Sequence, residues 1–249
     1  ARNQTEDDYC VLNYEEPVMR KFAETLKCHV LFFSSQHKLE KGIYLDNDKI
    51  IYKNPDEVEV CHVDELQILG THNYENVMAA VCMAAVYGVP METIRKAILA
   101  FKGVAHRIEY VAEKNGVVYY NDSKGTNIGA TLAAIDGLGA AIEPQQGKVA
   151  IILGGQGKGQ DFTALRDALS KYAKLAVLIG EDRPIIEKAI AGTTALLHAA
   201  TLKEAVEICQ QHAQANDVVL LSPACASFDM FKGYSERGQQ FVDCVNVLA

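Results

Sequence analysis

The chain has 249 residues, enough for one large or two modest domains with a buried core. Hydrophobic residues make up 49% and charged residues 22%, an ordinary globular composition that excludes wholesale disorder. The formal net charge is -8, so the sequence lacks the basic excess that a nucleic-acid or anionic-lipid surface needs. No apolar run approaches the ~20 residues of a membrane span. We therefore expect neither a nucleic-acid nor a membrane partner.

The seven cysteines are an odd number, lie far apart and include no Cys-x-x-Cys pair. Zinc-ribbon and thioredoxin sites therefore have no support, and the histidines show no ligand-like spacing, so we expect no metal site. Cysteines among apolar neighbours, such as Cys82, behave as small hydrophobic residues, which favours a reduced, cytoplasmic setting. The sequence starts at Ala1 without a signal peptide, and we expect a piece of a longer chain.

The first part of the chain is predicted to be mostly strands followed by helices. Alternating residues around the turn-forming Asp46-Asn47-Asp48 indicate a hairpin. Apolar residues at helical spacing then predict a helix that Gly88 and Pro90 terminate. The expected elements are strands at 9–13 and 30–35 with a helix between them at 16–26, the hairpin at 42–53, and helices ending before 88 and spanning 91–101.

After Gly103 the pattern changes to strands and helices in regular alternation. A hairpin is predicted over Asn115-Gly116, and the later strands are short apolar runs, typical of strands buried on both faces. Such alternation predicts an α/β fold with a doubly wound, mostly parallel sheet that binds ligands at the carboxyl ends of its strands. Strands are expected at 148–155, 175–180, 195–199 and 217–223, and helices at 131–138, 162–173, 183–192, 201–213 and 235–248.

Three loops that follow predicted strands combine small residues with hydroxyls or a lysine. Each precedes a helix or turn, whose free backbone amides favour an anion. We expect these loops to meet at one edge of the sheet and form a pocket for carboxylates or phosphates. They are residues 121–127, 154–162 and 222–229.

The glycine-rich loop, residues 154–162, can also be interpreted as a simple tight turn. It is not a Walker A loop, because Ile152 and Gly159 stand where that motif needs Gly and Ser or Thr. It is not a dinucleotide motif either, because Gln160 replaces the last glycine. What it offers a ligand is Lys158 on flexible backbone.

Other polar residues also have two interpretations. Asn73 and Asn76 lie three apart near a helix start and could hold a ribose or base edge, although a helix cap plus a solvated side chain explains either alone. Asp122 and Lys124 could be a structural ion pair. Arg107 at the domain junction could reach a nucleotide or form an ordinary interface salt bridge.

Taken together and in this order, five motifs resemble those of the Mur ligase family, specifically its D-glutamate-adding branch. The resemblance covers essentially the whole chain, and the combination of Asp-Ser-Lys-x-Thr-Asn with Ser-Pro-Ala-Cys-Ala-Ser is specific to that branch. The motifs are GTHNYENVMAA, FKGVAHRIEYV, NDSKGTN, GGQGKGQDF and LSPACASFDMFKGYSERGQQF.

The resemblance implies that residues 1–103 are the back part of an α/β ATPase domain and that 104–249 are a C-terminal Rossmann-like domain that binds the incoming amino acid. It implies ATP-dependent amide formation, in which D-glutamate is added to UDP-N-acetylmuramoyl-L-alanine through an acyl phosphate during peptidoglycan precursor synthesis. ATP is then a co-substrate, and the Mg²⁺ ligands and other catalytic residues are expected upstream, since no Gly-Lys here precedes Ser or Thr. We expect the chain alone to be inactive, and the protein to be a monomer.

The resemblance also assigns site residues. Those expected to bind D-glutamate are Thr126, Lys158, Ser227, Phe228 and Tyr234. Those expected to bind the nucleotide are Asn73, Asn76, His106, Arg107, Asp122 and Lys124. Two alternatives remain open: a related ligase that adds another amino acid, and a non-catalytic nucleotide-binding Rossmann-like domain. An oxidoreductase is disfavoured, because NDSKGTN replaces the glycine fingerprint in the first strand–helix turn.

Overall fold

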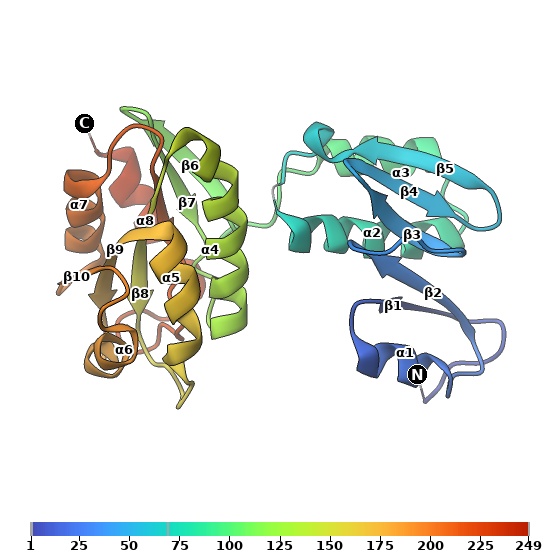
Figure 1. The fold of residues 1–249 in the computed structure, drawn as a ribbon, viewed down its shortest axis with the longest axis horizontal. Helices are drawn as coiled ribbons and strands as arrows, with labels where there is room; N and C mark the ends of the chain where they lie inside the picture. Colours follow the sequence, from blue (N-terminus) through green and yellow to red (C-terminus); the bar gives the residue numbers. More distant parts are fainter. Residues whose placement is uncertain (1, 69, 249) are drawn as a thin grey trace. The chain divides into compact units, whose positions relative to one another are not determined.

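The computed structural model describes residues 2–68 and 70–248. The chain divides between Lys102 and Gly103 into two compact units, drawn in blue to cyan and in green to red in Figure 1. Each unit has its own sheet and its own hydrophobic core. None of the helices in the described ranges is long and apolar enough to cross a bilayer.

The first unit contains a five-stranded mixed sheet in the order β1-β2-β3-β4-β5. The first three strands pair in parallel, and β3, β4 and β5 pair antiparallel. Its elements are β1 (Tyr9–Asn13), α1 (Pro17–Ala23), β2 (His29–Ser34), β3 (Gly42–Asp46), β4 (Lys49–Lys53), β5 (Glu57–His62), a short 3₁₀ turn (Val63–Glu65), α2 (Thr71–Val86) and α3 (Met91–Ala100).

Helix α2 packs on this sheet through Val77, Met78 and Val81, which repeat at helical spacing and are buried with Ile43 of β3. The hairpin predicted at 42–53 is confirmed, with Asn47 in the left-handed region (φ 53°) at its turn.

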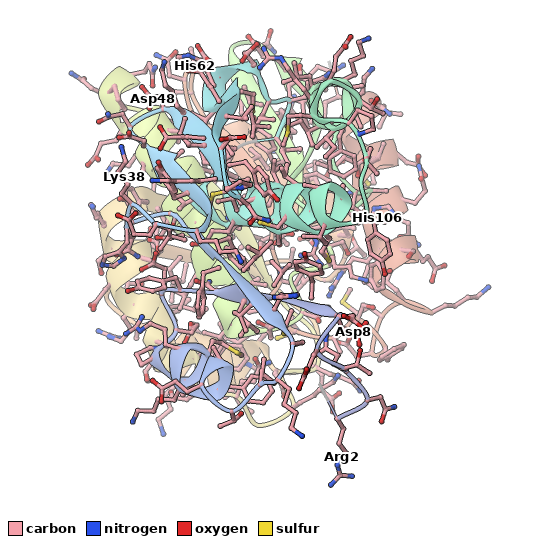
Figure 2. All side chains as sticks on the ribbon, turned by 90° about the vertical axis from the view of Figure 1, so that its right-hand side faces the viewer. Arg2, Asp8, Lys38, Asp48, His62 and His106 are labelled. Carbon is pink, nitrogen blue, oxygen red and sulfur yellow. The ribbon has the colours of Figure 1, made fainter. Side chains whose placement is uncertain are left out.

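Strand β5 is an element that the sequence prediction missed. Its glutamates alternate with valines, and Val60 is fully buried while Glu57 and Glu59 are exposed, as expected for an edge strand. Its end returns to the β3–β4 turn, where the Val63 amide donates to the Asp48 carbonyl (2.9 Å). Figure 2 labels Asp48 and the adjacent His62 at this end of the sheet.

The second unit contains a six-stranded sheet in the order β10-β9-β8-β11-β7-β6, in which only the β6–β7 pairing is antiparallel. Its elements are β6 (Glu109–Lys114), β7 (Val117–Asn121), α4 (Ile128–Ile142), a 3₁₀ turn (Glu143–Gln145), β8 (Val149–Gly154), a 3₁₀ turn (Phe162–Leu165), α5 (Arg166–Tyr172), β9 (Ala173–Ile179), α6 (Arg183–Ile190), β10 (Ala195–His198), α7 (Leu202–His212), β11 (Val218–Leu221) and α8 (Tyr234–Asn246).

Helices cover both faces of this sheet, with α4, α5 and α6 on one side and α7 and α8 on the other (Figure 1). Strand β8 lies between the two layers: Ile151 and Leu153 pack toward the first, Ala150 and Ile152 toward the second, and all four are fully buried. The predicted doubly wound, mostly parallel α/β fold is therefore confirmed.

Two local expectations in this unit are wrong. The strand predicted at 195–199 is not buried on both faces, because β10 is the last strand in the sheet order and its side chains are mostly exposed. The helix predicted at 131–138 begins at Ile128, because the Asn127 side chain caps it by accepting a hydrogen bond from the Ala130 amide (3.0 Å).

Candidate functional site

Three loops lie side by side at the carboxyl edge of the second sheet, as the sequence pattern predicts. Strand β11 lies between β7 and β8, and all three run parallel. Leu221 at the end of β11 is in register with Asn121 of β7 and Ile152 of β8. The loops that follow these strands are therefore neighbours.

The glycine-rich loop is joined to the loop after β11 by backbone hydrogen bonds. Gln156 and Ala226 exchange a pair of them, each 2.9 Å long, and the Gly154 amide donates to the Pro223 carbonyl (2.9 Å). Gly155 has φ 130°, and a Cβ atom there would lie 2.2 Å from the Ala226 carbonyl oxygen. A glycine at this position allows the two loops to approach each other closely.

Gln160 links all three loops, and the sequence prediction did not single it out. Its Oε1 accepts from the Ile128 amide at the start of α4 (3.0 Å), and its Nε2 donates to the carbonyls of Gly157 (2.9 Å) and Ala224 (3.0 Å). With Asn127 as cap, two of the first amides of α4 already have protein partners. These two amides are therefore not free to bind a ligand at this edge.

Among the residues expected to bind D-glutamate, Lys158 is the cation. It has φ 54°, is exposed, and forms no ion pair or side-chain hydrogen bond with the rest of the described chain. Thr126 is half-buried, and Ser227 is only 2% exposed. Phe228 is 65% exposed, so it lies at the surface of the loop after β11.

Lys124 contacts Tyr234 and does not pair with Asp122, so the ion-pair interpretation is wrong. Its Nζ donates to the Tyr234 hydroxyl (3.0 Å) and lies 4.3 Å from the centroid of that ring. This hydrogen bond lowers the pKa of Tyr234. Two of the predicted residues, assigned to different ligands, thus contact each other.

Asp122 is buried beneath the loop, with 4% exposure. Its Oδ2 accepts from the Ser222 hydroxyl (2.6 Å) and its Oδ1 from the Ile108 amide (3.3 Å). Burial raises the pKa of Asp122 to about 6, because desolvation penalises the charged carboxylate. A Cβ atom on Gly125 would lie 2.4 Å from Oδ2, so the glycine in NDSKGTN leaves room for this carboxylate.

His106 packs against the same loop, whereas Arg107 is exposed. The His106 backbone has φ 65°, and its Nδ1 lies 2.9 Å from Nδ2 of the buried Asn121, which identifies Nδ1 as the acceptor. The ring also lies against Gly238, where a Cβ atom would approach Nδ1 to 2.3 Å. Asn121 is a further site residue that the sequence prediction did not name.

Asn73 and Asn76 belong to the first turns of α2 in the first unit. Asn73 is 8% exposed, and Asn76 is exposed. Their expected contact with a nucleotide stays a prediction.

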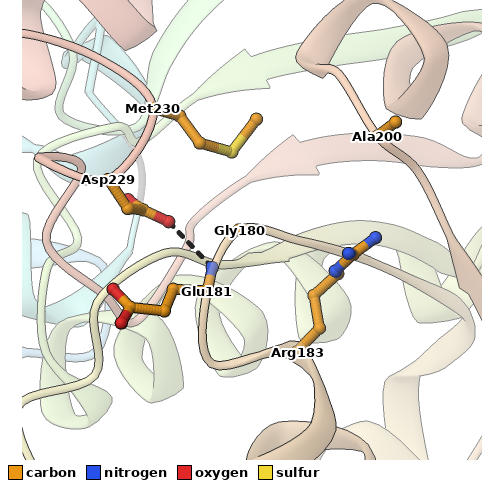
Figure 3. Close-up of a pocket in the computed structure, with 6 residues that line it drawn as sticks. All are labelled: Gly180, Glu181, Arg183, Ala200, Asp229 and Met230. Atoms are coloured by element: carbon orange, nitrogen blue, oxygen red, sulfur yellow. Dashed lines mark hydrogen bonds between the residues drawn. The ribbon is translucent and has the colours of Figure 1, made fainter.

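A pocket of about 470 Å³ lies at the ends of β9 and β10. In Figure 3, the Asp229 carboxylate accepts a hydrogen bond from the Glu181 amide (2.8 Å). None of the predicted site residues lines it; the lining residues are Gly180, Glu181, Arg183, Ala200, Asp229 and Met230. Within the described ranges, no three His, Cys, Asp or Glu side chains group as metal ligands would.

Comparison with known proteins gives consistent relatives. The family "Mur ligase, glutamate ligase domain" matches residues 106–225. A UDP-N-acetylmuramoylalanine–D-glutamate ligase of Acinetobacter baylyi is 57% identical over 207 residues, covering 83% of this chain and 46% of the relative. The ligase of the same name from Lachnoclostridium phytofermentans is 44% identical, covering 100% of this chain and 54% of the relative. The chain thus spans about half the length of these curated relatives.

Solved structures agree on the fold. A UDP-N-acetylmuramoylalanyl-D-glutamyl-2,6-diaminopimelate–D-alanyl-D-alanyl ligase from Acinetobacter baumannii has a TM-score of 0.65 at 17% identity, covering 98% of this chain and 52% of its own. A pseudomurein peptide ligase type C from Methanothermus fervidus has a TM-score of 0.66 at 16% identity, covering 94% of this chain and 56% of its own.

Proposed function

We propose that the chain belongs to the Mur ligase family and supplies the D-glutamate-binding part of an ATP-dependent ligase that adds D-glutamate to UDP-N-acetylmuramoyl-L-alanine. The observation that carries the proposal is the meeting of three loops whose polar side chains suit a dicarboxylate. The names of the curated relatives point to the same amino acid. We place this step of peptidoglycan precursor synthesis in the cytoplasm.

The proposed chemistry follows from the charges of D-glutamate. Two carboxylates need compensating donors when they enter a partly desolvated pocket. Lys158 provides the cation, since its exposed side chain has no ion pair or hydrogen-bond partner in the described chain. Thr126 and Ser227 add neutral hydroxyl donors. Held in this way, the D-glutamate amine would be oriented to attack the activated alanine carboxylate.

ATP would supply the phosphoryl group that activates that carboxylate. We propose Asn73, Asn76, His106, Arg107, Asp122 and Lys124 as its contacts. Exposed Arg107 fits this role, since a guanidinium suits phosphate oxygens. Asp122 fits less well, because both its oxygens already accept hydrogen bonds. Mg²⁺ would accompany the nucleotide, since this ion is usually held by substrate phosphates together with one or two carboxylates.

Titration of the ¹⁵N-labelled chain with D-glutamate, followed by NMR, tests the proposal. We expect D-glutamate to shift the amide signals of the three loops more strongly than L-glutamate or L-lysine does. Lys158→Ala should weaken D-glutamate binding about ten- to a hundredfold, since a charge-assisted hydrogen bond is worth roughly 1.5–3 kcal/mol. Lys188→Ala, which removes an exposed lysine in the last turn of α6, is the matched control and should change nothing.

Three results would contradict this assignment. Equal shifts with L-lysine would favour a ligase for another amino acid. Shifts with ATP but with no amino acid would favour a nucleotide-binding domain. Unchanged affinity in Lys158→Ala together with lost affinity in Lys124→Ala would exchange the roles of the two lysines.

A further inference from the structure

Arg237 is a fully buried arginine whose guanidinium pairs with no carboxylate of the described chain. Its exposed fraction is 0%, and it lies in α8, one turn after Tyr234. Burial lowers its pKa to about 10, so the side chain remains charged at neutral pH. Removing such a cation from water is costly, and its hydrogen bonds must offset that penalty.

The side-chain hydrogen bonds of Arg237 go to two of the three loops. Its Nε donates to the Ser123 hydroxyl (3.0 Å), and its Nη2 donates to the carbonyls of Ser123 (2.8 Å) and Cys225 (3.1 Å). Ser123 lies three residues before Thr126, and Cys225 lies two residues before Ser227. One side chain therefore fixes the spacing between two segments that supply proposed D-glutamate contacts.

The same network includes the start of α8. The Ser123 hydroxyl, which accepts from Arg237, donates to the Tyr234 carbonyl (2.7 Å). A hydroxyl can donate and accept at once, so this one atom joins Arg237 to the backbone of Tyr234. The Tyr234 side chain in turn accepts from Lys124. The loop after β7 and the first turn of α8 are thereby held together.

A second anchor lies at the far end of the loop after β11. Asp229 Oδ2 accepts from the Glu181 amide (2.8 Å), and Ser227 lies between this anchor and Cys225. Within the described ranges, Arg237 Nη1 and Asp229 Oδ1 are the buried side-chain atoms without a hydrogen-bond partner. The negative charge of Asp229 favours the charged form of Arg237.

We infer that Arg237 is a positioning residue for the D-glutamate site, holding Thr126, Ser227 and Tyr234 in one arrangement without contacting the ligand. This inference rests on the proposed function. Replacing Arg237 by an apolar side chain of similar length removes a buried charge, which offsets part of the cost of leaving the Ser123 and Cys225 carbonyls without this donor. A positioning role predicts that the replacement keeps the fold and weakens the site.

The test compares Arg237→Met, Arg237→Lys and Ser123→Ala in the 249-residue chain. Each variant is measured by thermal unfolding and by NMR titration with D-glutamate. We expect Arg237→Met to remain folded and to bind D-glutamate roughly ten- to a hundredfold more weakly, since displaced binding groups lose most of their contribution. Arg237→Lys should recover part of the affinity, because an ammonium can still donate to one of the two carbonyls.

Ser123→Ala and one control variant sharpen the result. Ser123→Ala removes the shared hydroxyl but keeps the bonds from Arg237 to the two carbonyls, so it should weaken D-glutamate binding less than Arg237→Met does, by roughly fivefold. Arg166→Met is the matched control, because Arg166 also donates to two backbone carbonyls, those of Ala189 and Ala191, away from the three loops. It should leave the affinity unchanged.

The outcomes separate this inference from the proposed function. If the unmodified chain binds D-glutamate and Arg237→Met binds it within twofold, the inference is wrong and the proposed function stands. If Arg237→Met does not fold, unchanged affinity in Ser123→Ala overturns the inference and weakened affinity supports it. If the unmodified chain shows no response to D-glutamate, the proposed function fails and the inference fails with it.

Discussion

Replacing Asp122 by asparagine should make the second unit more stable at pH 7.5. The physical reason is that Asp122 is buried, so that its pKa rises from 3.8 to about 6 in the folded chain. A raised pKa means that the folded state prefers the protonated form. The stability that Asp122 contributes is therefore fully present below pH 3.8 and is lost as the pH rises through about 6.

The size of the effect follows from the pKa difference. A shift of about 2 units corresponds to about 3 kcal/mol between the fully protonated and fully ionised limits. Roughly half of this loss occurs below pH 5, and the other half, about 1.5 kcal/mol, occurs between pH 5 and 7.5. The bond from Ser222 is retained in the variant, because an amide oxygen accepts as a carboxylate oxygen does, whereas the longer bond from the Ile108 amide is lost. This loss is the same at both pH values, so it does not change the pH dependence.

Urea unfolding at pH 5.0 and 7.5 measures this difference. The stability gain of Asp122→Asn over the unmodified chain should be about 1.5 kcal/mol larger at pH 7.5 than at pH 5.0. Asp136→Asn, a change at an exposed residue of α4, should show no such dependence. An NMR titration of the Asp122 carboxyl carbon gives its pKa directly. A midpoint near 4, or an equal stability difference at both pH values, would refute the reasoning.

Three further substitutions test the packing around the sheet. Gly155→Ala should destabilise the chain by at least about 2 kcal/mol, because its Cβ would meet the Ala226 carbonyl. Gly159→Ala faces open space and should cost about 1 kcal/mol. Urea unfolding measures both variants. Asp217→Asn should cost about 1–3 kcal/mol in the same measurement, because it weakens the buried end of the ion pair with Lys174 (2.8 Å). Equal effects of the two glycine variants, or an unchanged stability in Asp217→Asn, would contradict these expectations.

Local pattern was sufficient for the layout of the second unit. Apolar runs such as 148–155 predict a strand buried on both faces, and Asn115-Gly116 predicts a hairpin turn, since both signals act over a few neighbouring residues. The family resemblance likewise needs only motifs in order. Strand β5 was missed because its exposed glutamates hide the alternating valines of an edge strand.

The partners of polar side chains were decided by the tertiary structure. Sequence proximity suggested that Lys124 pairs with Asp122, yet Lys124 donates to Tyr234, which lies 110 residues further along the chain. Asp122 is instead buried against Ser222, 100 residues away. No sequence pattern distinguishes Arg237 from other helical arginines, but in the structure its guanidinium donates to the carbonyls of two loops. Spacing along the chain determines which face of an element a residue occupies, but desolvation and hydrogen bonding across the sheet edge determine what it contacts.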